Sequence, residues 1–269
     1  MEDDFRDPRP PEWSLESVAA RLETMGYFLR GEGVTPSSAA ATGTAQRSAI
    51  RFSGTGDALK RLQRFYGLEE TGVPDRPTIA ILEMPGCGNP DPIGPEELGA
   101  GFPGWPTSNL TYSIGQLGGI VSLGVMRAII VSACKVWSEA SALTFRETIS
   151  EGELRFSFGN DEHGDGFPFD GEHIGNSGLV LAHAFRPDFP ERNLAGEIHF
   201  DSDELWSSDA ICPPSRKDLL TVAIHEIGHA LGLRHVGDTD SVMFRGYQGV
   251  RRQLARADED SIRSLYPKL

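Results

Sequence analysis

Cysteine is scarce in this chain of 269 residues, which contains only Cys87, Cys134 and Cys212. Three cysteines cannot build the framework of several disulfides that staples small secreted domains. Cys134 and Cys212 are then either two buried thiols or one bridge, and the sequence favours two thiols. Stability must come from a hydrophobic core, which a chain of this length can supply.

The chain also lacks a run of about 18 apolar residues, so we expect no transmembrane segment. Basic residues number 25 against 39 acidic ones, and a net charge of −14 argues against nucleic acid and against an anionic membrane as partners. It favours bound cations such as calcium. Residues 1–12 are acidic and proline-rich, which predicts a disordered tail, and they lack the apolar segment of a signal peptide.

Histidine occurs seven times, always between positions 163 and 235. Three of these residues lie in the segment HEIGHALGLRH. Residues four apart share one helix face, so His225 and His229 can bind one metal ion. Gly232 can adopt the positive φ that ends the helix, which lets His235 arrive as a third ligand. Three histidines leave the fourth position of a zinc ion open for water, and Glu226 is placed to take a proton from that water.

The competing interpretation is a helix with two core histidines that fall four apart by chance. Five fixed positions disfavour it, because long metal motifs have a low false-positive risk. The pattern HExxHxxGxxH with a later methionine resembles the signature of the metzincins. That resemblance makes Met243 a candidate for the Met-turn beneath the ligands.

Hydrophobic spacing divides the chain into a helical part and a mixed part. Helices are predicted from Ser14 to Gly26, from Asp57 onward and from Asp75 through Leu82, with a loop at 31–49. Strands are predicted at 110–114, 143–145 and 154–158, and helices at 123–139 and after a cap at Ser215.

The segment ALKRLQRFYGLEETGVPDRPTIAILEMPGCGNPD resembles the peptidoglycan-binding-like prodomain of matrixins, the matrix metalloproteinases, running into their cysteine switch. The resemblance implies that Cys87 is the latency ligand to the catalytic zinc, a role that a thiolate suits. Gly86 stands where the switch usually has an arginine, which leaves the strength of latency open.

This resemblance implies an α+β fold: a small three-helix prodomain, then a metzincin (zincin-like) catalytic domain with a twisted, mostly parallel five-stranded sheet and three helices. The expected divisions are a tail at 1–12, the prodomain at 13–91, a linker or activation segment at 92–104 and the catalytic domain at 105–269. We expect no hemopexin-like domain.

The matrixin pattern also implies further ligands and a substrate cleft. A structural zinc would take His163, Asp165, His183 and His199, and at least one calcium would take Asp170, Gly171, Asp201 and Glu204. A second family calcium site is left unassigned, because Glu153 and Glu197 stand at its usual aspartates. An extended peptide would pair with the strand edge at Leu181 and Ala182, and Tyr247 would line the substrate pocket.

The expected function is that of a zinc-dependent metalloendopeptidase made as a latent zymogen. It would hydrolyse internal bonds of protein or peptide substrates by Glu226-assisted attack of a water that the catalytic zinc activates. By family analogy the protein would be secreted, and we expect a monomer. The alternative is a catalytically silent, metal-stabilised module that binds cell-wall or matrix glycans. Glu226 discriminates the two, because hydrolysis needs it and binding does not.

Overall fold

The structure is a computed structural model that describes residues 13–29, 44–92, 101–170 and 179–268, without the side chains of 44–53. It contains two compact units, Met1–Leu82 and Glu83–Leu269. Residues 83–91 belong to the second unit by their contacts, although the sequence groups them with the prodomain. Among the described residues, no helix is long and apolar enough to cross a membrane.

The first unit contains three helices, as predicted: α1 (Leu15–Thr24), α2 (Thr44–Phe65) and α3 (Arg76–Leu82). Ser14 caps α1 by accepting a hydrogen bond from Ser17 N at 3.1 Å. A buried amide joins α2 to α3 and to the turn before it: Gln63 donates to Thr78 Oγ1 of α3 at 2.9 Å and accepts from Gly72 N in the turn at 2.8 Å. The loop predicted through residue 49 is wrong from Thr44 onward, because alanine, glutamine and arginine in this stretch favour a helix.

The second unit is built on a six-stranded sheet with the order β1-β5-β6-β4-β2-β3. Its strands are β1 (Gly86–Cys87), β2 (Asn109–Ile114), β3 (Thr144–Glu147), β4 (Leu154–Gly159), β5 (Val180–Ala184) and β6 (Glu197–Asp201). All pairs are parallel except β5 with β6. The three strands predicted by residue range are β2, β3 and β4, and the sheet has six strands where five were expected because β1 pairs with the edge of β5.

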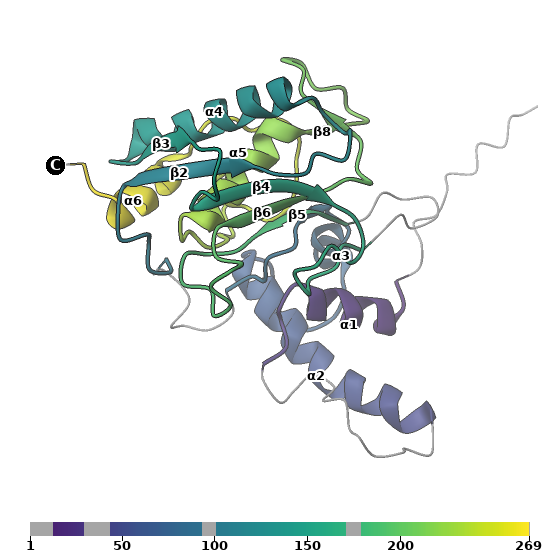
Figure 1. Cartoon of the computed structure of the whole chain (residues 1–269). Coiled ribbons are helices and arrows are strands. Elements are labelled where there is room, and N and C mark those ends of the chain that lie inside the picture. The colour runs from purple at the N-terminus through teal and green to yellow at the C-terminus, as the bar shows by residue number, and fades with distance from the viewer. Residues whose placement is uncertain (1–12, 30–43, 93–100, 171–178, 269) are drawn as a thin grey trace, which may run out of the picture. The chain divides into compact units, whose positions relative to one another are not determined.

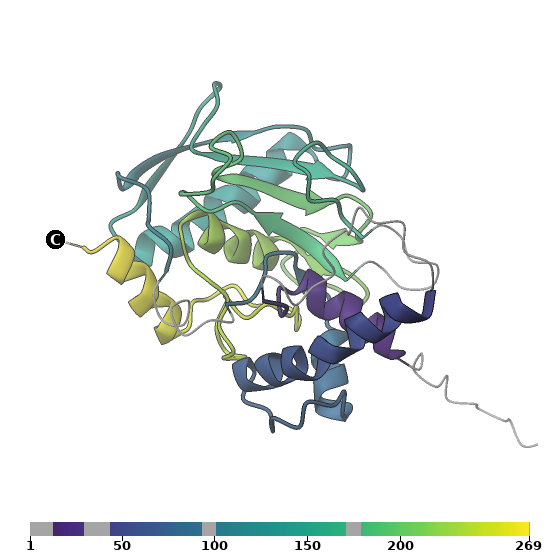
Figure 2. The same cartoon turned by 90° about the horizontal axis from the view of Figure 1, so that it is seen from below.

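Two long helices lie on one side of this sheet, as Figures 1 and 2 show. They are α4 (Leu123–Ala140) and α5 (Leu219–Ala230), and a third helix, α6 (Arg256–Leu265), follows near the chain end. Trp137 of α4 is fully buried and donates its indole N–H to the carbonyl of Ile224 in α5 at 3.0 Å. This contact fixes α5, the helix that carries the HExxH segment, against the core.

The start of α5 differs from the prediction. Its cap is Asp218, which accepts from Thr221 N at 3.0 Å, and not Ser215. The chain stays extended up to this point because β8 (Lys217–Asp218) pairs with β7 (Trp206–Ser207). Arg252 then compensates the buried carboxylate of Asp218 through a hydrogen bond of 2.9 Å.

The three cysteines are unbridged. Cys134 is buried in α4, whereas Cys212 is partly exposed. Of the two interpretations that the sequence left open, the structure therefore has separate thiols.

Candidate metal centre and active site

The three histidines of the HExxHxxGxxH segment converge on one point. His225 Nε2 lies 3.1 Å from His229 Nε2 and 3.2 Å from His235 Nε2. Nitrogens bound to one tetrahedral zinc at 2.0–2.1 Å would be about 3.3 Å apart, so the spacing fits this ion. Gly232 has a φ of +104° and reverses the chain after α5, as the sequence predicted.

The outward nitrogens of these rings fix their orientation. His225 Nδ1 lies 2.6 Å from the carbonyl oxygen of Val242, and His229 Nδ1 lies 2.9 Å from that of Leu233. His235 Nδ1 lies 2.8 Å from Asp91 Oδ1, and both side chains are inaccessible to solvent. A ring whose Nδ1 donates to an oxygen presents the lone pair of Nε2 to a metal.

Burial keeps the three rings neutral. It lowers the pKa of His225 to about 3, with help from the neighbouring His229, and brings the pKa of His229 and His235 well below the ordinary value. Neutral imidazole is the form that binds a metal. The Nε2 lone pairs of the three rings are therefore available to bind a metal cation.

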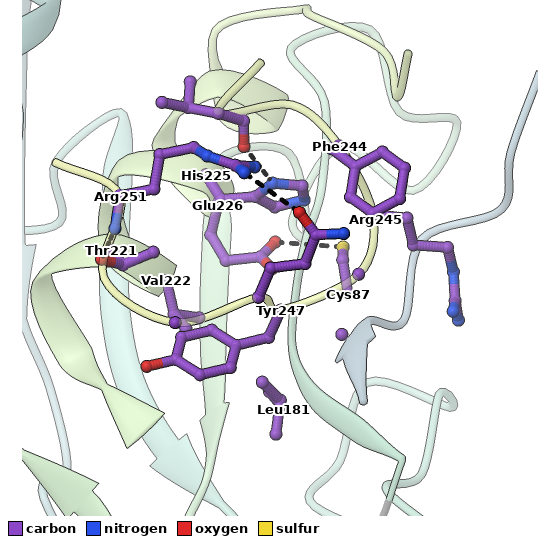
Figure 3. A pocket seen from close by; sticks show the side chains of 15 residues that line it. Cys87, Leu181, Thr221, Val222, His225, Glu226, Phe244, Arg245, Tyr247 and Arg251 are labelled. Atoms are coloured by element: carbon purple, nitrogen blue, oxygen red, sulfur yellow. Dashed lines mark hydrogen bonds between the residues drawn. The ribbon is translucent and has the colours of Figure 1, made fainter. Parts of the chain in front are cut away.

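Cys87 and Glu226 complete this group, which we call the catalytic cluster (Cys87, His225, Glu226, His229 and His235). The sulfur and the three ring nitrogens lie within 4.8 Å of one another. Figure 3 shows Cys87 and Glu226 pointing toward each other, and the thiol donates to Glu226 Oε2 at 3.5 Å. Burial raises the pKa of Glu226 to about 8, and burial with the nearby Glu226 carboxyl raises that of Cys87.

The segment around Cys87 is held by main-chain hydrogen bonds on both sides. Gly86 N donates to Leu179 O at 2.9 Å and Gly88 N to Ala182 O at 2.8 Å. On the other side, Cys87 N donates to Arg245 O at 3.1 Å and Tyr247 N to Pro85 O at 2.7 Å. β1 thus fills the space between the edge strand β5 and the 245–247 segment.

A pocket opens beside the catalytic cluster. Its lining includes Leu181, Val222 and Tyr247 next to His225 and Glu226. Tyr247 accepts a hydrogen bond from Asp218 N at 2.8 Å, which ties this wall to the start of α5. Arg245 also lies on the wall, but Figure 3 shows its guanidinium turned away from Cys87 and Glu226. Of the predicted substrate residues, Leu181 and Tyr247 line the pocket, and Ala182 pairs with β1.

Met243 lies directly under α5. A Cβ atom on Gly228 would lie 2.4 Å from Met243 Sδ and 3.0 Å from the Trp137 ring, so a larger residue there would displace the methionine side chain. The turn that carries Met243 is held by Asp258 of α6, which accepts from Val242 N at 2.9 Å and from the Ser241 hydroxyl.

Four more predicted ligands form a second tetrahedral group, which we call the histidine–aspartate cluster (His163, Asp165, His183 and His199). The ring nitrogens that face one another are 3.1–3.3 Å apart, and Asp165 Oδ2 lies 2.8–2.9 Å from each of them. Hydrogen bonds from His183 and Phe167 N, against the opposing effect of burial, hold the pKa of Asp165 well below its usual range. All four positions are supplied by protein, which is typical of a structural zinc site.

The predicted calcium residues are only partly described. Asp201 and Glu204 are buried, and Glu204 Oε1 has no hydrogen-bond partner within the described ranges. Burial and neighbouring carboxylates such as Asp203 raise the pKa of Asp201 to about 6 and that of Glu204 to about 7. Asp170 accepts from Leu179 N at 2.7 Å, whereas Gly171 lies outside the described residues. A buried carboxylate oxygen without a donor fits a hard cation such as calcium.

Sequence reasoning missed three residues that support the site. Asn89 binds the end of β5 through two hydrogen bonds: its side-chain amide donates to Ala184 O at 2.7 Å and accepts from Ala184 N at 3.1 Å. Asp91 contacts His235, and Asp258 holds the Met243 turn. Asp91 ends the GCGNPD segment, but nothing local in the sequence says which ring it meets.

The mixed sheet, the two packed helices and the histidines over a methionine turn define a metzincin-type domain. Comparison with protein families agrees: residues 104–267 match the matrixin family of peptidases, and residues 18–82 match a family described as putative peptidoglycan binding domain. The chain belongs to the matrixin family, whose members depend on zinc.

Several curated relatives match most of this chain. The chain is 36% identical to human neutrophil collagenase over 229 residues, 82% of this chain and 46% of the relative. It is 38% identical to mouse stromelysin-1 over 77% of this chain and 42% of the relative, and 38% identical to bovine interstitial collagenase over 78% and 42%. The chain thus spans less than half the length of these relatives. A peptidase family over the larger unit does not favour the glycan-binding alternative.

The raised pKa values of Asp201 and Glu204 predict how pH acts on stability. A carboxyl group whose pKa is higher in the folded state binds its proton more tightly there, so stability falls as pH rises from about 4 to about 8. A divalent cation held between the carboxylates would offset that loss. Calcium should therefore raise the melting temperature of the calcium-depleted protein clearly at about pH 8 and little at about pH 5. Calorimetry at both pH values tests this, and equal shifts would contradict it.

Proposed function

We propose that this protein is a latent zinc endopeptidase that cleaves internal peptide bonds of protein substrates. One observation carries the proposal: the nitrogens of three neutral imidazoles and the sulfur of Cys87 lie within 4.8 Å of one another, and the carboxyl of Glu226 lies 3.5 Å from that sulfur. The nitrogen and sulfur ligands suit zinc. Once Cys87 leaves, the arrangement has an open position, as catalytic zinc sites do.

The residues of the chain have separate roles in this reaction. An extended substrate takes the place of β1 and hydrogen-bonds to the main chain at Leu179, Ala182 and Arg245. The bound zinc ion supplies Lewis acidity, which polarises the scissile carbonyl and acidifies water. Glu226 accepts the proton of the attacking water and delivers it to the leaving amine. Its carboxyl is fully buried and accepts from the Cys87 thiol, so it faces the position that Cys87 would vacate.

Latency rests on the main-chain pairing of the switch segment as well as on its thiol. Gly86 has no room for a side chain, because a Cβ atom there would lie 2.1 Å from Arg245 O. The family arginine is therefore not needed to hold the segment. The segment is held by the hydrogen bonds of β1, by those of Asn89 to Ala184 and by the contact of Asp91 with His235. We assign Cys87 as the latency ligand on this basis.

Two further metal sites belong to the proposal. The histidine–aspartate cluster would hold a structural zinc, and Asp201 and Glu204, with Asp170 and Gly171, would hold at least one calcium. Metal ions, and not disulfides, would then stabilise the segment that carries these ligands. Such stabilisation would suit a monomer that acts outside the cell, where calcium is abundant.

Glu226→Ala tests the catalytic role. The variant should keep its zinc, because no ligand is removed, and lose more than about 10³-fold in kcat on a peptide substrate after thiol modification, because general-base assistance is lost. Zinc content and cleavage rate are measured on the same sample. Glu139→Ala, which removes an exposed carboxylate of α4, is the control and should be as active as the parent. Near-parental activity of Glu226→Ala would refute the assignment.

Latency is tested by two variants of the uncleaved chain. Cys87→Ser should cleave peptides without any processing, because a hydroxyl is a poor zinc ligand at neutral pH. Gly86→Ala should also become partly active, because its Cβ pushes β1 away from Arg245 O. Gly124→Ala has open space around its Cβ position and should stay as latent as the parent. If Gly86→Ala and Cys87→Ser were both fully latent, the switch would lie elsewhere.

A further inference from the structure

Glu197 lies between a guanidinium and one ring of the histidine–aspartate cluster. Its Oε1 accepts from Arg155 Nε at 3.3 Å and from Nη2 at 3.2 Å, and its Oε2 lies 3.3 Å from His199 Nε2. The parallel pairing of β4 with β6 places Arg155 opposite Glu197. The carboxylate therefore uses one oxygen for each neighbour.

The opposite side of the His199 ring faces the cluster. His199 Nδ1 lies 2.8 Å from Asp165 Oδ2, 3.1 Å from His163 Nε2 and 3.2 Å from His183 Nε2. His163 has its outward Nδ1 2.9 Å from a backbone carbonyl, that of Asp161, whereas His199 has a carboxylate in that position. A proton held on Nε2 by a carboxylate leaves the Nδ1 lone pair free for a metal and makes the ring more basic.

Arg155 is itself fixed by the loops around it. It donates through Nη1 to Gly152 O at 3.4 Å and through Nη2 to Asn193 O. The side chains of Arg155 and Glu197 are 22% and 24% exposed, so their attraction is partly screened and adds little to stability. Arg155, Glu197 and His199 also line a surface hollow of about 350 Å³, which gives solvent a path to this side of the cluster. The ion pair is better placed to orient His199 than to stabilise the fold.

We propose that Glu197 is a positioning residue for the second metal: it holds His199 with Nδ1 aimed into the cluster, and Arg155 holds Glu197 in place. This inference rests on the proposed structural zinc but not on the peptidase activity. Two residues outside the predicted ligand set thereby set the zinc affinity of the histidine–aspartate cluster.

The test is equilibrium dialysis of the full chain against a graded series of zinc chelator, with zinc per chain measured by elemental analysis. The parent should hold two zinc ions, and His163→Ala defines the content without the second site. Glu197→Gln should release the second zinc at a free-zinc level about 10- to 100-fold higher than the parent, the usual cost of losing such a partner, and keep the first. Arg155→Met should shift in the same direction by less.

The exposed pair Arg127 and Glu147, 2.7 Å apart, provides the control, since Arg127→Met and Glu147→Gln remove an ion pair of the same sheet unit. Urea unfolding at saturating zinc is measured in parallel. If the Arg155–Glu197 pair were only structural, all four variants would lower the urea midpoint alike and leave zinc affinity unchanged, which would overturn the proposal. So would a Glu197→Gln variant that keeps both zinc ions and loses a calcium-dependent rise in melting temperature.

Zinc content and cleavage separate this inference from the proposed function. A parent that holds one zinc and cleaves peptides with Glu226 dependence overturns the second site and leaves the peptidase standing. A parent with two zinc ions, sensitive to Glu197→Gln but without Glu226-dependent cleavage, supports the positioning role and contradicts the peptidase.

Discussion

Three imidazole rings, those of His225, His229 and His235, are buried away from water with their Nε2 atoms close together. The rest of the domain depends on this constraint. Their pKa values are lowered by burial and by mutual repulsion, so each ring stays neutral, with a single proton, in the folded protein. Each lone pair then needs a partner that is not a proton, and a metal cation is that partner. The fold places these lone pairs at the end of α5, next to the buried carboxyl of Glu226.

The supporting structure maintains the convergence from several directions. Trp137 fixes α5 to α4, and Asp258 of α6 holds the turn whose carbonyl at Val242 orients His225. Gly228 leaves room for Met243 beneath the rings. The edge of β5 pairs with β1, which brings Cys87 to the histidines. The metal ligands and this edge are thus adjacent because the same helix packs on the same sheet.

The sequence predicted the parts that depend on local periodicity. The spacing of His225 and His229 follows from the helical repeat, the φ of Gly232 from its missing side chain, and the second cluster from the family pattern. It did not predict contacts that arise only when distant segments meet: Asp91 with His235, Asp258 with the Met243 turn, or Glu197 between Arg155 and His199. The cap of α5 was placed three residues early because the pairing of β7 with β8, which keeps the chain extended to Asp218, leaves no signal in the local pattern.

X-ray absorption spectroscopy of the zinc-loaded chain tests the central claim most directly, provided that His163→Ala is used to remove the second zinc. We expect a zinc ion with nitrogen neighbours at about 2.0–2.1 Å and one sulfur at about 2.3 Å in the uncleaved protein. After removal of the switch segment, the sulfur should be replaced by an oxygen while the nitrogens stay. A zinc ion without sulfur in the uncleaved chain, or one whose nitrogen shell changes on cleavage, would contradict it.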